Sequence, residues 1–158
     1  KRTGAGLMLK EDKLRVFIEG AQNYFSQIDK EEIIVGTPYL VENNMPAAHD
    51  YTGIIGISGN NSGIVYFTAP RILLAHMLES IKEPDLSEDN MTDLVGEVAN
   101  TIAGNARSEF GEQFQISVPI VIRGIPDEIL LPRKDRSFVI PLEWRKHQAA
   151  IVISLRKS

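Results

Sequence analysis

The spacing of hydrophobic and polar positions along the chain changes from helical to strand-like, and it does so twice. Residues 10–28 place apolar side chains at helical intervals, at Leu14, Phe17, Ile18, Ala21, Phe25 and Ile28. Three strand-like runs follow at 32–41, 50–58 and 63–69, and the sequence GNNSG at 59–63 predicts a turn between the last two. The first part of the chain is therefore predicted to form one helix followed by three strands.

The remaining part repeats this order after a short connection. A short helix and a linker are predicted over 70–87, with Pro70 at the start of the helix. A helix of about twenty residues is predicted from 88 to Phe110, capped by Ser87 and ended by Gly111. Three strands follow at 114–123, 137–143 and 148–155. The first alternates so that one face carries Phe114, Ile116, Val118, Ile120 and Ile122.

These patterns predict an α+β fold made of two pseudo-repeated helix–three-strand units, about 10–69 and 88–155. The strands form a mostly antiparallel sheet, and the two long helices pack on one face of it. Each unit has a proline in its first strand, Pro38 and Pro119, which implies an edge strand or a bulge. Aligning EGAQ (19–22) with EVAN (97–100) suggests a duplication, but helix-then-strand patterns also resemble one another by chance.

Composition narrows the class of protein. A chain of 158 residues fits one domain, 1–158, and its net charge of −4 without a basic run argues against nucleic-acid binding. There is no cysteine, which excludes a disulfide or a thiolate metal site and suits a reducing cytosol. No metal site is expected, because the histidines are isolated at His49, His76 and His147. The apolar runs are too short to span a bilayer. The sequence opens on Lys1, so a segment upstream is conceivable.

The helix predicted from residue 88 carries the unusual chemistry. At 100° per residue, one stripe of it holds Asp93, Glu97, Asn100, Gly104 and Arg107. Gly96 and Ala103 flank that stripe, and small residues there would let a partner approach closely. Glycine inside a helix costs about 1 kcal/mol relative to alanine. Two other interpretations of this helix stay open. The polar stripe could be the solvated face of an ordinary surface helix, and the glycines could serve helix packing.

The sequence DLVGEVANTIAGNARSEF, followed by ISVPIVIRG, resembles the signature of the CheX branch of the CheC/CheX/FliY chemotaxis phosphatases. The residues that match the family pattern are Asp93, Glu97, Asn100 and Pro119. The sequences FTAP at 67–70 and FVIPLEW at 138–144 also fit, so the resemblance covers most of the chain.

The resemblance implies a partner and a reaction. The partner would be a phosphorylated response regulator of the CheY type, which brings its own aspartyl phosphate, lysine and Mg²⁺, so that no cofactor is expected on this chain. Asn100 would position the attacking water and Glu97 would pair with the regulator's lysine. Further partner contacts are expected from Asp93, Gly96, Ala103, Gly104 and Arg107. The family also implies a homodimer and a cytoplasmic location.

Other functions remain open at this point. The same helix could serve a module that docks on a response regulator or a flagellar-switch component without hydrolysis, or the chain could be a structural domain of a larger assembly. Asn100 favours the phosphatase, because a pure binding module has little need of an amide there. A second site at Glu19 and Gln22 is disfavoured by the bulky Tyr24 and Phe25 beside it.

Overall fold

The helices lie where the sequence predicts them. The computed structural model describes residues 11–41, 48–125 and 137–157. A 3-10 helix at Glu11–Leu14 leads into α1 (Arg15–Ile28), and α2 (Arg71–Ser80) follows Pro70. The second long helix, α3 (Glu88–Asn105), is interrupted at Ala106 and continues as the short α4 (Arg107–Phe110). The Ser87 side chain accepts a hydrogen bond from the Asn90 amide at 3.3 Å, which confirms the predicted cap.

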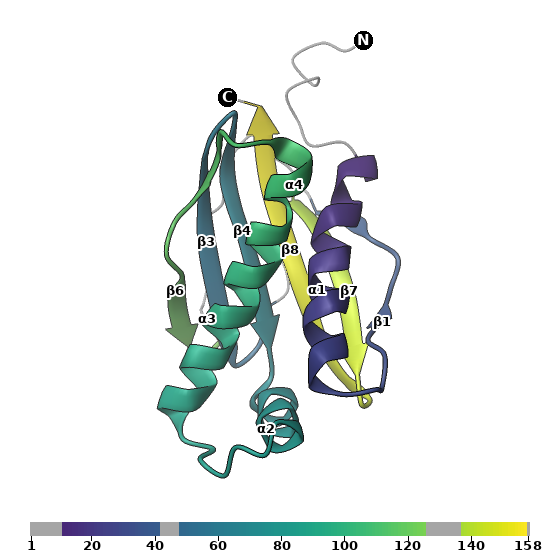
Figure 1. The fold of residues 1–158 in the computed structure, drawn as a ribbon, viewed down its shortest axis with the longest axis vertical. Coiled ribbons are helices and arrows are strands. Elements are labelled where there is room, and N and C mark those ends of the chain that lie inside the picture. Colours follow the sequence, from purple (N-terminus) through teal and green to yellow (C-terminus); the bar gives the residue numbers. More distant parts are fainter. Residues whose placement is uncertain (1–10, 42–47, 126–136, 158) are drawn as a thin grey trace.

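Within the described residues, eight strands form one antiparallel sheet. The strands are β1 (Ile34–Val35), β2 (Tyr39–Val41), β3 (Tyr51–Gly59), β4 (Asn61–Ala69), β5 (Phe114–Ile116), β6 (Ile120–Arg123), β7 (Ser137–Trp144) and β8 (His147–Lys157). Their order is β1-β7-β8-β4-β3-β5, with β2 also on β7 and β6 also on β3. Both long helices cover the same face of the sheet (Figure 1). This is the predicted α+β architecture.

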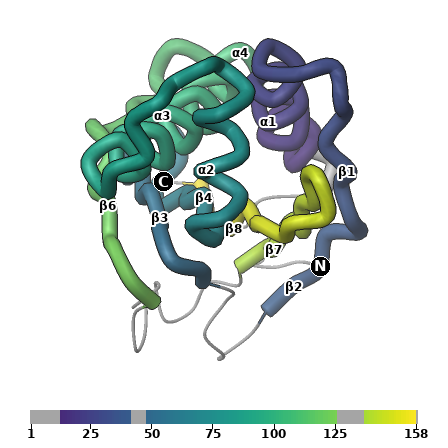
Figure 2. The backbone as a smooth tube through the Cα atoms, turned by 90° about the horizontal axis from the view of Figure 1, so that it is seen from below, coloured from purple at the N-terminus to yellow at the C-terminus, as the bar shows by residue number. Residues whose placement is uncertain are grey.

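Each half of the chain completes the sheet of the other half. The β3–β4 hairpin of the first half carries β5 and β6 of the second half on its outer side. The β7–β8 hairpin of the second half carries β1 and β2 of the first half. The two hairpins meet where β4 pairs with β8, at the middle of the sheet. In the view of Figure 2, β6 lies at the left of the molecule and β2 at the lower right.

Both predicted first strands are broken around their prolines, which is the main departure from the predicted elements. The run 32–41 becomes β1 and β2, and the run 114–123 becomes β5 and β6. Proline has no N–H to donate to a ladder, so Pro38 and Pro119 fall between the two short strands, at the edges of the sheet as predicted. The predicted apolar face of 114–123 is wrong in part, because Val118 is 80% exposed and Ile120 64% exposed.

The core lies between the helices and the sheet. Phe17, Phe25, Phe67 and Trp144 are completely or almost completely buried there, and the Trp144 indole N–H donates to the Glu31 carbonyl at 3.2 Å. Helix α3 lies close to β3: a Cβ on Gly53 of β3 would be only 2.7 Å from the Val95 carbonyl oxygen of α3. A second, smaller buried cluster is made by Tyr66, Val139, Ala150 and Val152. The close packing of α3 on β3 determines which side of α3 faces solvent.

Candidate functional site

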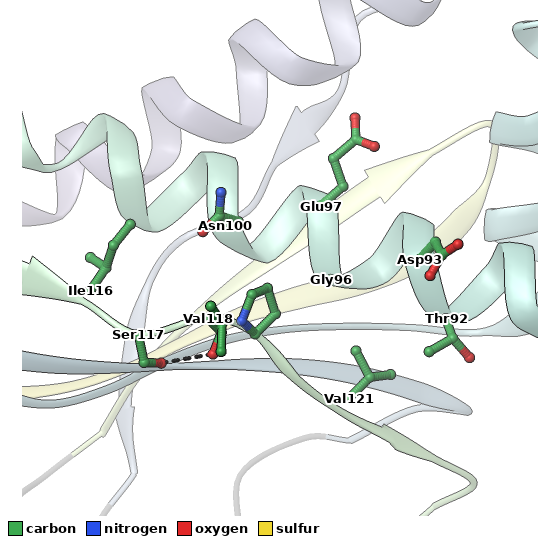
Figure 3. A pocket seen from close by; sticks show the side chains of 10 residues that line it. Thr92, Asp93, Gly96, Glu97, Asn100, Ile116, Ser117, Val118 and Val121 are labelled. Carbon is green, nitrogen blue, oxygen red and sulfur yellow. Dashed lines mark hydrogen bonds between the residues drawn. The ribbon is translucent and has the colours of Figure 1, made fainter.

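A groove of about 570 Å³ runs between α3 and the segment 116–121 (Figure 3). Helix α3 supplies one wall and the broken edge strand supplies the other. The groove is lined by Thr92, Asp93, Gly96, Glu97, Asn100, Ile116, Ser117, Val118, Pro119 and Val121. All four residues of the motif that the sequence singled out, Asp93, Glu97, Asn100 and Pro119, therefore line one groove, although the proline lies on a different element from the other three.

The helix positions its polar residues by burying their neighbours. Leu94, Val95 and Val98 are buried in the core, whereas Asp93, Glu97 and Asn100 are exposed on the other side of α3. The orientation of these three side chains therefore follows from the apolar pattern of the helix.

Gly96 allows the helix and the edge strand to lie close together. A Cβ at this position would stand 3.3 Å from Val121 Cγ2 and 3.5 Å from Pro119 Cβ. Gly96 is itself buried but lines the groove. Gly96 therefore serves the packing of the helix on the edge strand, and a role in packing was one of the interpretations that the sequence left open. Because Gly96 has no side chain, it also leaves the groove beside it unfilled.

Three of the residues expected to contact a partner do not line the groove. Ala103 is fully buried and offers no surface to a partner; this prediction is wrong, because Ala103 stands two helical turns after Gly96 on the same buried side of α3. Arg107 is exposed but begins α4, after the interruption at Ala106, and does not line the groove. Gly104 is half-buried just beyond the groove, with Ile116 Cδ1 4.0 Å from a Cβ built on it.

Glu97 has a partner on α1 that the sequence did not reveal. The Tyr24 hydroxyl donates a hydrogen bond to Glu97 Oε1 at 3.0 Å. Burial, followed by the negative charge of Glu97, raises the pKa of Tyr24, so the phenol stays protonated. Figure 3 shows the Glu97 side chain pointing away from the segment 116–121. No local signal connects two residues so far apart in sequence; only the packing of α1 on α3 brings them together.

The chemistry available in the groove is that of a carboxylate and an amide. The Ser117 hydroxyl is engaged with backbone, accepting from the Gly56 amide at 2.8 Å and donating to the Val118 carbonyl at 2.9 Å. The residues lining the groove include neither a cysteine nor a histidine. Glu97 and Asp93 can accept hydrogen bonds from a cation, while Asn100 can donate and accept at once. Such a set can bind and orient groups that a partner supplies.

No metal site is apparent in the described part of the chain, where no group of three histidine, aspartate or glutamate side chains gathers. The expectation that all three histidines are isolated is wrong for two of them: the rings of His76 and His147 lie 4.9 Å apart. Among the described helices, none is long and apolar enough to cross a membrane.

In the first half, the two aligned polar positions have different surroundings from Glu97 and Asn100. Glu19 pairs with Arg15 at 3.7 Å, and Gln22 lines a different hollow at the end of α1 that Glu19 does not reach. In the alignment of EGAQ with EVAN, Ile18 takes the place of Gly96. Ile18 packs against the core, so a bulky side chain stands where α3 has only hydrogen.

Comparison with known proteins places the chain among chemotaxis proteins. The family model described as chemotaxis phosphatase CheX matches residues 51–143. No curated protein matches the sequence at a significant level. A putative chemotaxis protein from Desulfovibrio vulgaris Hildenborough is 28% identical, with a TM-score of 0.80 over 91% of this chain and 96% of that one.

Two further solved structures are similar. The chemotaxis protein CheX from Desulfovibrio desulfuricans is 27% identical, with a TM-score of 0.76 over 93% of this chain and 99% of that one. The CheX of Borrelia burgdorferi, solved in a complex of CheX, CheY, BeF3 and Mg²⁺, is 19% identical. Its TM-score is 0.72 over 94% of this chain and 100% of that one, and at this identity the likeness is one of fold.

Proposed function

Because the chain belongs to the CheX family of chemotaxis phosphatases, we propose that it hydrolyses the aspartyl phosphate of a phosphorylated CheY-type response regulator. One observation carries the proposal: Asp93, Glu97, Asn100 and Pro119 line the same groove, with the three polar residues exposed. The Borrelia relative, solved with CheY, BeF3 and Mg²⁺, supports the choice of partner.

In this proposal Asn100 orients the attacking water. Phosphoryl transfer depends mainly on positioning and electrostatic stabilisation, so an amide that holds a water in line can accelerate it without a nucleophile on the enzyme. An amide can accept a hydrogen bond from the water while it donates one to a phosphoryl oxygen. The absence of a cysteine or histidine from the groove lining agrees with direct attack by water.

Glu97 fixes the register of docking by pairing with the regulator's active-site lysine. Asp93 contributes a second negative charge to the same side of the groove. The Mg²⁺ ion comes with the regulator and needs no site on this chain. Since the proposed partner is a cytoplasmic signalling protein, we place the reaction in the cytoplasm.

We also propose a homodimer, formed through the sheet edge that lies away from the groove. Tyr39 on β2 is 48% exposed and Leu40 beside it is 41% exposed, so this edge presents large side chains to solvent. The other edge borders the groove and remains free for the regulator. Two copies joined in this way would each keep a complete site.

The test is the decay of a phosphorylated CheY-type regulator in Mg²⁺, with and without the protein. We expect faster decay with wild-type protein, and about a hundredfold loss of that acceleration in Asn100→Ala. Binding to the beryllofluoride form of the regulator should persist, because Glu97 is unchanged. Gln22→Ala is the matched control: it removes the amide at the aligned position of the first half and should leave the decay fast.

The outcome separates the candidate functions. Binding without faster decay would contradict the phosphatase and support a non-catalytic docking module. Faster decay that survives Asn100→Ala would keep the phosphatase but remove Asn100 from its chemistry. A protein that neither binds nor dephosphorylates any CheY-type regulator of its own organism would contradict both functions.

A further inference from the structure

Tyr24 lies on α1 and makes a side-chain contact with α3, the helix that carries the proposed site. Its hydroxyl donates to Glu97 Oε1 at 3.0 Å. The Tyr24 ring is half-buried, packs against the main core and meets the Phe25 ring edge-on at 6.1 Å between centroids. Glu97 is exposed. A donor fixed by packing thus holds an acceptor that would otherwise be free to move.

We propose that Tyr24 is a positioning residue, which holds the Glu97 carboxylate in the conformation that binds a cationic side chain of the docked regulator. This inference rests on the proposed function, since it concerns how the same site recognises its partner. It adds α1 to the recognition machinery, which the motif itself confines to α3 and the segment around Pro119.

The hydrogen bond leaves Glu97 able to bind a cation. An ionised carboxylate has two oxygens and about four acceptor positions, and Tyr24 occupies one of them. A lysine ammonium can therefore approach while the phenol stays in place. The two donors then converge on one carboxylate, with the phenol approaching from α1 and the ammonium from the partner.

The hydrogen bond from Tyr24 favours docking because it reduces the conformational freedom of the Glu97 side chain. An exposed glutamate samples several rotamers, and ordering such a side chain at an interface weakens association. Because Tyr24 restricts Glu97 before the regulator arrives, less ordering is left for the docking step. Tyr24 also remains a donor at physiological pH, since burial and the charge of Glu97 both keep its proton in place.

The variant that tests this is Tyr24→Phe, which keeps the ring and removes the hydroxyl. We expect KM for the phosphorylated regulator and Kd for its beryllofluoride form to rise about three- to tenfold, with kcat little changed. The matched control is Tyr51→Phe. The Tyr51 hydroxyl donates to Glu88 Oε1 at 3.3 Å, on the first residue of the same helix but outside the groove. This control should leave both constants unchanged.

A double-mutant cycle excludes a merely structural role. If Tyr24 acts through Glu97, adding Tyr24→Phe to Glu97→Ala should change KM and Kd no further. Equal effects in the wild-type and Glu97→Ala backgrounds would overturn the proposal, as would a Tyr24→Phe variant with unchanged KM and Kd. Thermal unfolding of each variant shows whether any loss comes from instability.

The binding arm keeps this inference distinct from the proposed function. If the wild-type protein binds the beryllofluoride form but does not speed decay, the phosphatase fails and the Kd cycle alone decides the role of Tyr24. If decay is accelerated but the cycle shows no coupling, the phosphatase stands and the inference fails. If no CheY-type regulator of the source organism binds, both are overturned.

Discussion

At the scale of single residues, the groove depends on the lack of a side chain at Gly96. The helix backbone lies so near Val121 and Pro119 that even a Cβ would be in contact with them. The aligned position in the first half carries Ile18, which packs against the core. At this position the single hydrogen atom of Gly96 lets α3 approach the edge strand, whereas α1 presents a bulky side chain.

Gly96→Val should fill the groove and force the edge strand away from α3. We expect a loss of stability of about 1–3 kcal/mol from overpacking, together with weaker binding of the regulator. Gly96→Ala is the graded control, since its methyl meets Val121 at 3.3 Å and the gain in helix propensity offsets the crowding. Thermal unfolding and regulator binding measure both effects. A stable Gly96→Val variant that binds normally would contradict this account.

Thr92 carries a buried hydroxyl oxygen, at the lining of the groove, for which the described structure provides no hydrogen-bond partner. Thr92→Val removes that polar group at nearly constant volume. We expect stability to stay level or rise by up to about 1 kcal/mol, because an unsatisfied buried polar group is unfavourable. Chemical denaturation measures the change. A clear loss of stability would mean that the hydroxyl has a partner in solution.

At the scale of elements, α1 and α3 are joined by specific polar contacts as well as by core packing. The Asn105 side chain donates to the Val16 carbonyl at 2.8 Å, and it holds the end of α3 against the start of α1. This matters for the site, because the Tyr24–Glu97 bond depends on the same pairing of helices. The apolar periodicity predicted both helices, but it carried no information about which residues meet between them.

Asn105→Ala should cost about 1–2 kcal/mol, because it removes the partly buried hydrogen bond between the Asn105 side chain and the Val16 carbonyl. For a domain of this size, that corresponds to a fall in Tm of about 2–8 °C. Ser108→Ala is the control, since the exposed Ser108 hydroxyl bonds only locally to the Asn105 carbonyl and its removal should change little. Similar midpoints for the two variants would contradict the importance of the contact between helices.

The end of α1 is held to the turn between β7 and β8 by an ion pair of Asp29 with Arg145. The hydrogen bond from Arg145 is the main cause that lowers the pKa of Asp29. A carboxyl with a lowered folded pKa stabilises the protein above its unfolded pKa of about 3.9 and ceases to do so as the pH falls through the folded value. Acid should therefore remove this contribution.

We expect Asp29→Asn to lower the thermal midpoint at pH 7 and to approach wild type below about pH 4. Arg145→Gln should lower the midpoint at pH 7 in the same way. Unfolding curves between pH 7 and pH 2 test this. A gap between wild type and Asp29→Asn that stays constant over that range would exclude the ion pair as its cause.

At the scale of the whole molecule, the fold was predictable where one hydrophobic period runs over many residues. The strand-like runs at 50–58 and 63–69, with the turn sequence between them, and the helical spacing at 88–110 predicted the main elements. The breaks at Pro38 and Pro119 were predictable only as edge features, because the sequence shows which N–H is missing but not where pairing resumes. That residues 1–158 form a single domain with pseudo-repeats at 10–69 and 88–155 stays a prediction.

The placement of the candidate site residues was predictable to the same limit, and their roles stay predictions. The motif identified Asp93, Glu97, Asn100 and Pro119, and all four line the groove. Ala103 was misplaced because a helical wheel cannot show which flank of a stripe will face the sheet. Tyr24 was missed because its contact depends on the packing of α1 against α3.

The proposed homodimer gives a prediction at this scale. Leu40→Lys places a charge on the exposed edge formed by β2, and we expect it to convert a dimer into a monomer. Ile72→Lys is the control, because Ile72 is an exposed apolar residue on α2, away from that edge. Sedimentation velocity reports the mass of each variant. A monomeric wild-type protein would contradict the proposal outright.

The exchange of edge strands between the two halves also sets the order in which paired strands become available during synthesis. The groove is built from α3 and the segment around Pro119, and the neighbouring β6 pairs with β3, so all these parts are present once the chain has emerged as far as Arg123. The far edge must wait, since Tyr39 pairs with Val139 and Leu40 with Phe138. Contacts so distant in sequence form slowly. The nascent chain can thus assemble its groove while β1 and β2 still lack the strand on which they will lie.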